Sequence, residues 1–172
     1  KYGIGFTEPR GSLNSSSAVV NVNFSDGSVT VIHGAVEMGQ GVHTKIAQVA
    51  AHTLGIPLSL IRIGDNHTDT IVNAPATAAS TGYDLNAGAV ELCCRVLRER
   101  LEKFCRDLEQ FNPHDCISEW RIDWADRWKE IVAKAWLNRI SLSAAELYKS
   151  PHYAGPSERH PQGHPFLYFV WG

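Results

Sequence analysis

Residues 18–55 have the sequence AVVNVNFSDGSVTVIHGAVEMGQGVHTKIAQVAAHTLG, in which the spacing of the apolar residues changes from that of strands to that of a helix. Apolar and polar residues alternate over residues 18–24 and again over residues 29–32, as they do in strands with one buried face. The two runs flank Ser25-Asp26-Gly27-Ser28, and an Asp-Gly pair favours a tight turn. The first half of the stretch therefore predicts a β-hairpin.

The second half of the stretch predicts a helix. Apolar residues recur with helical spacing at Val42, Ile46, Val49, Ala50 and Leu54. Gly55, followed by Ile56-Pro57, is typical of a helix end. Residues 34–41, which we call the glycine loop, therefore connect the second strand of the hairpin to the start of this helix.

The other elements follow from the same periods and from proline and glycine. Residues 65–82 are polar and show no regular pattern, and an ordered loop of this length is often functional. The remaining predicted segments are a strand at 60–64, helices at 85–111 and 124–139, an extended segment at 141–148, a proline-rich loop at 150–165 and a strand from 166. Asp123 is the expected N-cap of the last helix. The fold class is α+β, with a β-hairpin, mixed strands and three amphipathic helices.

The composition is that of an ordinary soluble globular protein, with 172 residues, 44% hydrophobic and 20% charged. A formal net charge of -2 excludes a broad field that would attract nucleic acid or an anionic membrane, and no run of about 18 apolar residues predicts a membrane span. The chain does not begin with Met and ends in a strand-like run, so we expect residues 1–172 to be a partial domain, truncated at both ends.

Gly39-Gln40-Gly41 has the outline of a ligand site. It lies between a predicted strand and the start of a helix, where unpaired backbone N–H groups and the helix dipole favour an anion or a ligand rich in acceptors. The glycines permit close approach to the backbone, and the Gln40 amide both donates and accepts. A ligand-free glycine turn is the alternative, because the segment matches neither the phosphate-binding loop nor the dinucleotide glycine pattern.

Four segments, in order, resemble the xanthine dehydrogenase and aldehyde oxidase family. The sequence from Glu37 to Lys45, followed by Gln48-Val49-Ala50 and Gly55-Ile56-Pro57, is similar to the family's glycine-glutamine-glycine segment. The other three segments are Gly3-Ile4-Gly5-Phe6-Thr7, then Pro75-Ala76-Thr77-Ala78-Ala79-Ser80 with Asp84-Leu85-Asn86 and Ala89-Val90, and finally Ser141-Leu142-Ser143-Ala144 with Tyr148. Together they span most of the chain.

This resemblance implies a part of a molybdopterin-binding domain. Cofactor contacts would come from Met38, Gly39, Gln40, Gly41, Thr77, Ala78, Ala79 and Ser80, with Ala79 beside the molybdenum. Phe6 and Thr7 would face the substrate, by stacking and by a hydroxyl hydrogen bond; packing in the core is their alternative. No catalytic residue lies in this stretch, because the family's glutamate base comes from a later segment.

The resemblance also implies the activity and the partners of the intact protein. It would be a molybdenum-dependent oxidoreductase that hydroxylates purines, other N-heterocycles or aldehydes with oxygen derived from water, and the choice between xanthine and aldehyde stays open. Domains or subunits with 2Fe-2S clusters and FAD would pass electrons to NAD or oxygen. The intact enzyme would be a cytoplasmic or peroxisomal homodimer, with no nucleic acid or membrane as partner.

Two departures from the family pattern stand out. The chain carries a few extra residues between Pro9 and Leu13, and Gly82 stands where a second hydroxyl is common; Thr81 is a possible replacement for that hydroxyl. Glu37 is expected to be solvated or to cap the backbone, since a lone carboxylate is usually exposed. His160 and His164 have a spacing that some zinc sites use, but no further pair completes a tetrahedron.

Several other residues are expected to be structural. His43 and His52 are interpreted as ordinary polar or packing residues, and the spacing of Trp120, Trp124, Trp128 and Trp136 indicates helix core. The cysteines lack a C-x-x-C pair and are predicted to be reduced thiols of a cytosolic protein; they are Cys93, Cys94, Cys105 and Cys116. Two alternatives to the enzyme remain: a non-catalytic homologue that keeps the fold for binding or assembly, and a free-standing small binding domain.

Overall fold

The computed structural model describes residues 2–3, 15–70, 73–78, 80–114, 116–150, 161 and 168–169. The candidate site residues Phe6, Thr7, Ala79, His160 and His164 lie outside these ranges, as do Ile4, Gly5 and the extra residues between Pro9 and Leu13. The same holds for most of the proline-rich segment, of which only Ser150 and Pro161 are described.

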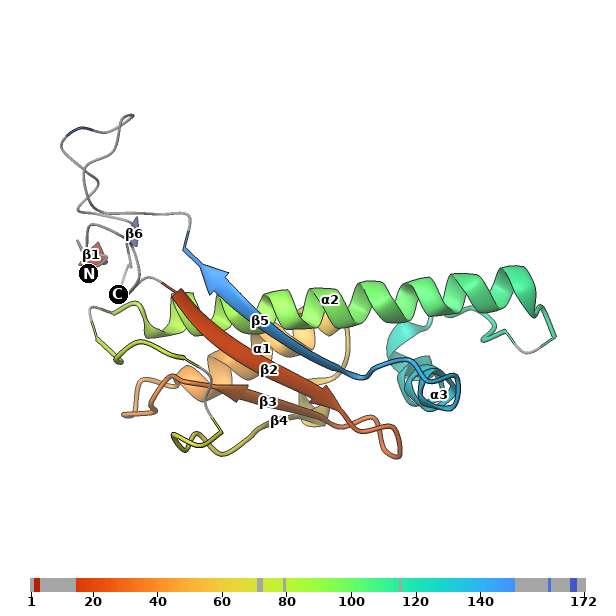
Figure 1. Cartoon of the computed structure of the whole chain (residues 1–172), viewed down its shortest axis with the longest axis horizontal. Coiled ribbons are helices and arrows are strands. Elements are labelled where there is room, and N and C mark those ends of the chain that lie inside the picture. The colour runs from red at the N-terminus through yellow and green to blue at the C-terminus, as the bar shows by residue number, and fades with distance from the viewer. Residues whose placement is uncertain are drawn as a thin grey trace.

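A four-stranded mixed sheet forms one layer of the molecule (Figure 1). The strand order is β4-β3-β2-β5, with bounds Ile61–Ile63, Val29–His33, Ser15–Val22 and Ser143–Lys149. β2 and β3 form the predicted antiparallel hairpin, in which Val22 is opposite Val29, and the chain closes it with a hydrogen bond from the Asn23 N–H to the Ser28 carbonyl at 2.8 Å. β3 and β4 run parallel. The hairpin and the extended segment at 141–148 are therefore confirmed.

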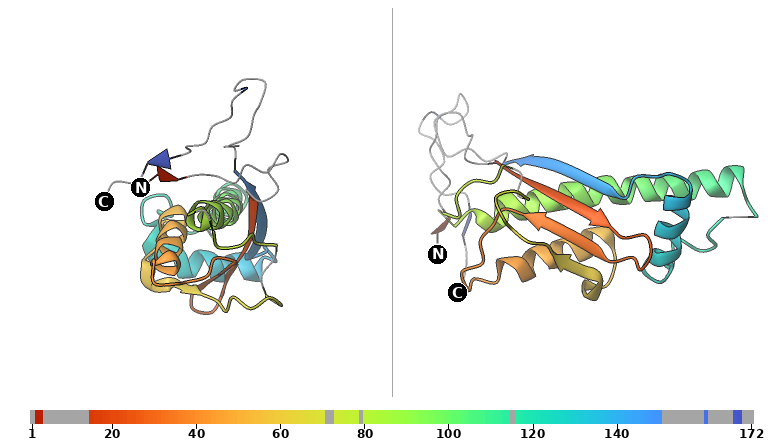
Figure 2. Two further views of the ribbon diagram at one scale, coloured as in Figure 1. Left: turned by 90° about the vertical axis from the view of Figure 1, so that its left-hand side faces the viewer. Right: turned by 60° about the horizontal axis from the view of Figure 1, so that its bottom comes forward.

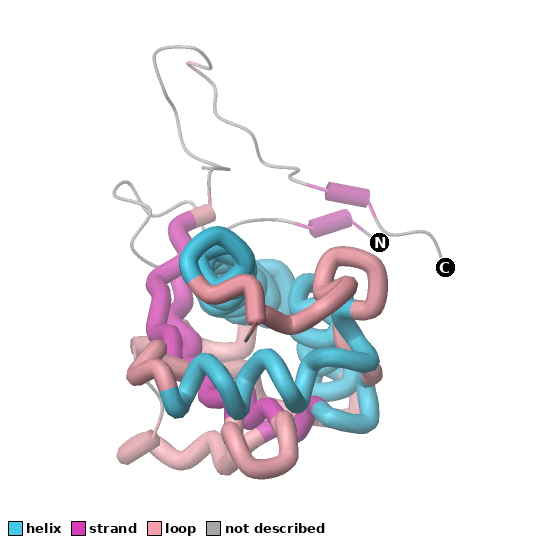
Figure 3. The backbone as a smooth tube through the Cα atoms, turned by 90° about the vertical axis from the view of Figure 1, so that its right-hand side faces the viewer, coloured by secondary structure: helices cyan, strands magenta, loops and turns pink. Residues whose placement is uncertain are grey.

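Three helices complete the fold, as predicted. They are α1 (Val42–Leu54), α2 (Gly82–Phe111) and α3 (Trp124–Leu137), and a short 3-10 turn, η1 (Leu58–Leu60), precedes β4. Figure 2 shows α1 and α2 side by side on one face of the sheet. Figure 3 is viewed from the right-hand side of Figure 1. It shows α3 side-on, lying across the end of the molecule that faces the viewer, and α2 along its axis.

Two further strands have only two residues each. They are β1 (Tyr2–Gly3) and β6 (Tyr168–Phe169), and they pair antiparallel. The strand expected from residue 166 is thus confirmed at Tyr168–Phe169. Within the part of the chain that the structure describes, no helix has both the length and the apolar character needed to cross a bilayer.

The core lies between the sheet and the helices. Its largest fully buried side chain is Trp128, whose Nε1–H donates to the Gly27 carbonyl at 2.7 Å and so ties α3 to the hairpin turn. Trp120 and Trp124 are buried as predicted, but the assignment of Trp136 to the core is wrong: it is 50% exposed, because it lies at the end of α3, and it stacks on Phe24. Three cysteines of α2 are buried free thiols, and burial raises the pKa of Cys93 to about 11 and of Cys94 and Cys105 to about 12.

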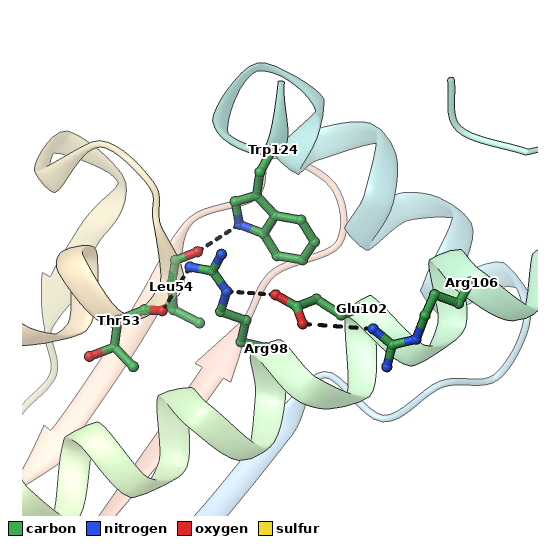
Figure 4. Close-up of polar contacts among 6 residues, drawn as sticks. All are labelled: Thr53, Leu54, Arg98, Glu102, Arg106 and Trp124. Atoms are coloured by element: carbon green, nitrogen blue, oxygen red, sulfur yellow. Dashed lines mark hydrogen bonds and ion pairs between the residues drawn. The ribbon is translucent and has the colours of Figure 1, made fainter. Parts of the chain in front are cut away.

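The C-terminal end of α1 is held by side chains from both other helices (Figure 4). Gly55 has a φ of 71° and its N–H donates to the Ala51 carbonyl, as in other glycine helix ends. The last two carbonyls of α1 accept from side chains: that of Thr53 from Arg98 at 3.2 Å, and that of Leu54 from the Trp124 indole at 2.6 Å. This joint locks the three helices together at a position remote from the glycine loop.

Candidate functional site

The glycine loop joins the end of β3 to the start of α1, and α2 begins at the same end of the molecule (Figure 1). Gly39 and Gly41 have φ angles of 93° and 74°, which side-chain-bearing residues rarely adopt. A Cβ atom at either position would meet nothing within 4 Å. The glycines are therefore required by the backbone conformation, and they leave open space in which a ligand can approach the backbone.

Glu37 organises the loop from within. Its carboxylate accepts the N–H groups of Gly39 at 2.9 Å, Gly41 at 2.9 Å and His43 at 3.1 Å. These hydrogen bonds, with those of Gly41 and then His43 the strongest, hold the pKa of Glu37 below its ordinary value. The capping role predicted for Glu37 is confirmed.

The expectation that the N-terminus of α1 presents unpaired N–H groups is only partly correct. Glu37 occupies the N–H groups of Gly41 and His43, so they do not face a ligand. The N–H groups of Gln40 and Val42 find no acceptor among the residues that the structure describes. Val42 is only 2% exposed, so a ligand at this loop would meet the N–H of the exposed Gln40 beside a fixed carboxylate, a pattern that suits a neutral polar group better than a bare anion.

The Gln40 side chain uses both ends of its amide inside the loop. Its Oε1 accepts the Met38 N–H at 2.6 Å and its Nε2 donates to the Val36 carbonyl at 2.8 Å. The amide does donate and accept as expected, but it braces the backbone and keeps one further N–H for a ligand. The Met38 side chain projects outward and is 68% exposed.

The first three N–H groups of the loop all donate to side chains. Gly34 donates to Asn86 Oδ1 at 2.9 Å, Ala35 to His33 Nδ1 at 3.2 Å and Val36 to Thr77 Oγ1 at 3.1 Å. None of these is a backbone hydrogen bond between strands. The conformation of the loop is therefore fixed by side chains, one of which lies 52 residues away in the sequence. The Val36–Thr77 bond joins the glycine loop directly to residues 73–81, the other segment expected to bind the cofactor.

Two of the described residues in the segment 73–81 have a strained backbone, and the hydroxyl of a third bonds within the segment. Asn73 and Ser80 have positive φ angles of 52° and 59° without being glycine, a conformation found disproportionately at functional sites. Ala78 and Ser80 are exposed. Thr81, considered as a replacement for the hydroxyl missing at Gly82, is 5% exposed and donates its Oγ1–H to the Ala78 carbonyl at 3.1 Å, so its hydroxyl serves the loop itself.

Two histidines meet beneath the glycine loop. Nε2 of His33 lies 3.2 Å from Nδ1 of His43. The Ala35 N–H can only donate, so His33 Nδ1 must be unprotonated, and the proton of the neutral ring lies on Nε2, where it donates to His43. Burial, and then the neighbouring His43, lower the pKa of His33 to about 4, which keeps this ring neutral.

Sequence reasoning missed His33 and the role of Asn86. The available signal was modest: His33 occupies an inward position in the alternating pattern of β3, and buried polar side chains need partners. His43 was interpreted as an ordinary polar or packing residue, and it does pack, on His33, which links α1 to β3. Among the described residues, no group of three or more His, Cys, Asp or Glu side chains is placed to hold a metal ion.

The sequence is similar to known proteins over its whole length. Residues 1–172 match the family described as "Molybdopterin cofactor-binding domain". The chain is 41% identical over 172 residues to the xanthine dehydrogenase/oxidase of Felis catus and 39% identical to aldehyde oxidase 2 of Mus musculus. All of the chain is aligned in both cases, and it spans 12% and 11% of the length of these two relatives.

Solved structures share the fold. A Cu,Mo-CO dehydrogenase superposes with a TM-score of 0.69 at 23% identity, over 87% of this chain and 21% of the other. Quinoline 2-oxidoreductase from Pseudomonas putida 86 superposes with a TM-score of 0.65 at 24% identity, over 80% of this chain and 19% of the other. With the sequence matches over its whole length, the chain belongs to the xanthine dehydrogenase and aldehyde oxidase family, in its molybdopterin cofactor-binding domain.

Proposed function

We propose that this chain forms part of the cofactor cradle of a molybdenum-dependent hydroxylase that acts on purines, other N-heterocycles or aldehydes. The observation that carries the proposal is the direct contact between its two expected cofactor segments. The Val36 N–H donates to Thr77 Oγ1 at 3.1 Å, and this bond holds the glycine loop against residues 73–81 at the end of the molecule where α1 and α2 begin.

The groups at this site suit a pterin. The open space beside Gly39 and Gly41 admits a flat ring close to the backbone, and the N–H group of the exposed Gln40 can donate to a ring acceptor. Gln40 would add its remaining amide N–H, and the exposed Met38 side chain would cover the ring. When bound, the molybdenum cofactor would supply a two-electron oxidant and a water-derived oxygen; the protein supplies binding and orientation.

Residues 73–81 would form the second wall of the cradle. Thr77, Ala78 and Ser80 are proposed cofactor contacts, and we extend the proposal to Ala79 beside the metal. Phe6 and Thr7 are proposed to face the substrate, the ring by stacking on a heterocycle and the hydroxyl by a hydrogen bond.

The rest of the enzyme is proposed from the length of the relatives, of which this chain spans 12%. We infer that residues 1–172 are part of a larger cofactor domain and that the catalytic base comes from another segment. Iron-sulfur and flavin domains would carry electrons to NAD or oxygen, in a cytoplasmic or peroxisomal homodimer.

A non-catalytic homologue is the second candidate. The observation that favours it is the missing hydroxyl at Gly82, directly after the second segment, which Thr81 does not replace because its own hydroxyl donates to the Ala78 carbonyl. Such a protein would keep the two segments in contact but would bind the cofactor weakly or not at all. Cofactor content, rather than fold, separates the two candidates.

The test is to purify the full-length protein from cells that make the cofactor, and to measure molybdenum, released pterin and turnover of purine and aldehyde substrates. Stoichiometric cofactor with turnover supports the enzyme; a folded protein without molybdenum refutes it. Gln40→Ala should lower cofactor retention or turnover with little effect on folding. Gln48→Ala, an exposed glutamine on α1 outside the loop, is the matched control and should behave as wild type.

A further inference from the structure

Asn86 lies near the start of α2 and bonds to β2, to the glycine loop and to the first residue of its own helix. Its Oδ1 accepts the Gly34 N–H and the Ser16 hydroxyl, each at 2.9 Å, and its Nδ2 donates to the Gly82 carbonyl at 2.8 Å. The residue is only 2% exposed. Because Gly34 and Ser16 are buried as well, the two groups that donate to Asn86 would stay unsatisfied if its Oδ1 were removed.

Asn86 links the glycine loop to the start of its own helix, which directly follows residues 73–81. Gly34 is the first residue of the glycine loop, and Gly82 directly follows residues 73–81. We propose that Asn86 is a positioning residue of the cofactor site, whose carboxamide sets the separation between the glycine loop and residues 73–81. This inference rests on the proposed function, because it assigns Asn86 a role in holding the same cofactor.

The chemistry of the three partners explains why a carboxamide stands at this position. The Gly34 N–H and the Ser16 hydroxyl hydrogen need an acceptor, whereas the Gly82 carbonyl, one turn earlier in the same helix, can accept a side-chain donor, and one planar amide serves all three. An ionised carboxylate would place an oxygen against the Gly82 carbonyl, and an aliphatic side chain would satisfy none of the three. The role therefore depends on the donor and the acceptor together.

The second link between the segments is more replaceable. Thr77 accepts the Val36 N–H at the rim of the site, where Val36 is exposed and water can take over the bond. Asn86 forms its link at the buried base. A small displacement at the base moves both segments relative to each other, and a misplacement of about 1 Å is sufficient to impair a binding or catalytic geometry.

The experiment uses the full-length protein purified with its cofactor, in the wild type and in three variants. Asn86→Leu removes the donor and the acceptor, and Asn86→Asp keeps the shape. Ser16→Ala is the matched control, because it removes the one bond of Asn86 that reaches neither cofactor segment. Molybdenum and pterin remaining on each protein are followed during dialysis at pH 8 and pH 6, with circular dichroism as the measure of folding.

Asn86→Leu should lose the cofactor about tenfold faster than the wild type at both pH values, with its secondary structure retained. Asn86→Asp should match it at pH 8 and approach the wild type at pH 6, because burial favours the protonated carboxyl, which donates to the Gly82 carbonyl. Ser16→Ala should retain the cofactor as the wild type does.

Three results would overturn the inference: wild-type retention in Asn86→Leu, equal loss in Ser16→Ala, or no recovery of Asn86→Asp at pH 6. If Asn86→Leu does not fold, the test rests on Asn86→Asp alone: its cofactor retention relative to the wild type must be higher at pH 6 than at pH 8. A wild-type protein that carries no molybdenum and no pterin refutes the proposed function and this inference with it, whereas a loaded wild type with an indifferent Asn86 refutes only the inference.

Discussion

Gly88 in α2 is packed closely against Tyr148 of β5. Replacing a helical glycine by alanine usually stabilises a protein, but at this position we expect it to destabilise. A Cβ atom at this position would lie 2.8 Å from Cδ1 and Cγ of Tyr148 and 2.9 Å from Cε1. Cγ is the ring atom closest to the backbone, so rotation of the ring cannot relieve all three contacts. Gly88→Ala therefore requires a shift of β5 or of α2.

The magnitude follows from two opposing effects. Replacing glycine by alanine inside a helix stabilises by about 1 kcal/mol, and overpacking costs about 1–3 kcal/mol. Gly88→Ala should thus lower the free energy of unfolding by about 0–2 kcal/mol. In a Tyr148→Ala background the same substitution meets no ring and should raise it by about 1 kcal/mol. The coupling energy between the two positions is then about 1–3 kcal/mol.

Urea unfolding of the 172-residue chain, followed by tryptophan fluorescence and circular dichroism, measures these differences, and coincident transitions check two-state behaviour. Gly82→Ala is the matched control, because its Cβ would meet only Thr77 Cγ2 at 3.7 Å. It should be neutral or slightly stabilising. If Gly88→Ala changes the stability equally in the two backgrounds, the close contact with Tyr148 does not exist in solution.

Three further predictions concern buried groups. Lowering the pH from 6.5 to 4 should reduce the free energy of unfolding by up to about 3 kcal/mol through His33. Its pKa is about 4 in the folded protein and about 6.5 in the unfolded chain, so the unfolded chain takes up the proton first. The same loss in His33→Asn during an acid titration would contradict this. Trp128→Phe should cost about 2–4 kcal/mol in urea unfolding, since it leaves the buried Gly27 carbonyl unpaired, whereas the exposed Trp136→Phe should cost under about 1 kcal/mol. A thiol reagent at pH 8 should label Cys116 first and the three buried cysteines of α2 only after unfolding; rapid labelling of two or more thiols would refute the burial.

The regular elements were predictable because each depends on residues close together in sequence. The hairpin follows from alternation on both sides of Asp26-Gly27, and α1 from apolar spacing that ends at Gly55. The cap by Glu37 is also local, since its partners lie two to six residues further on. The exposure of Trp136 was not predictable, because it depends on tertiary packing: its ring stacks on Phe24, 112 residues away, rather than in the core.

The site was predictable only in part, for a physical reason. Its segments were recognised by their sequences, and backbone N–H groups at Gly34 and Val36 do connect them. The acceptors for these groups come from Asn86 and Thr77, which are 52 and 41 residues away, and no pattern of a single sequence encodes such a distance. Asp123 shows the converse: it occupies the N-cap position of α3 as predicted, yet makes no side-chain cap bond.

The length of α2 has a consequence for the divergence of this family. Its 30 residues extend for about 45 Å, with residues 73–81 before its first turn and the connection to α3 after its last. Insertions or deletions between residues 112 and 123 therefore occur at the opposite end of a rigid rod from the glycine loop. Evolution can lengthen or shorten that connection without moving the cofactor loops, so homologues should vary most in length there and least beside Gly39-Gln40-Gly41.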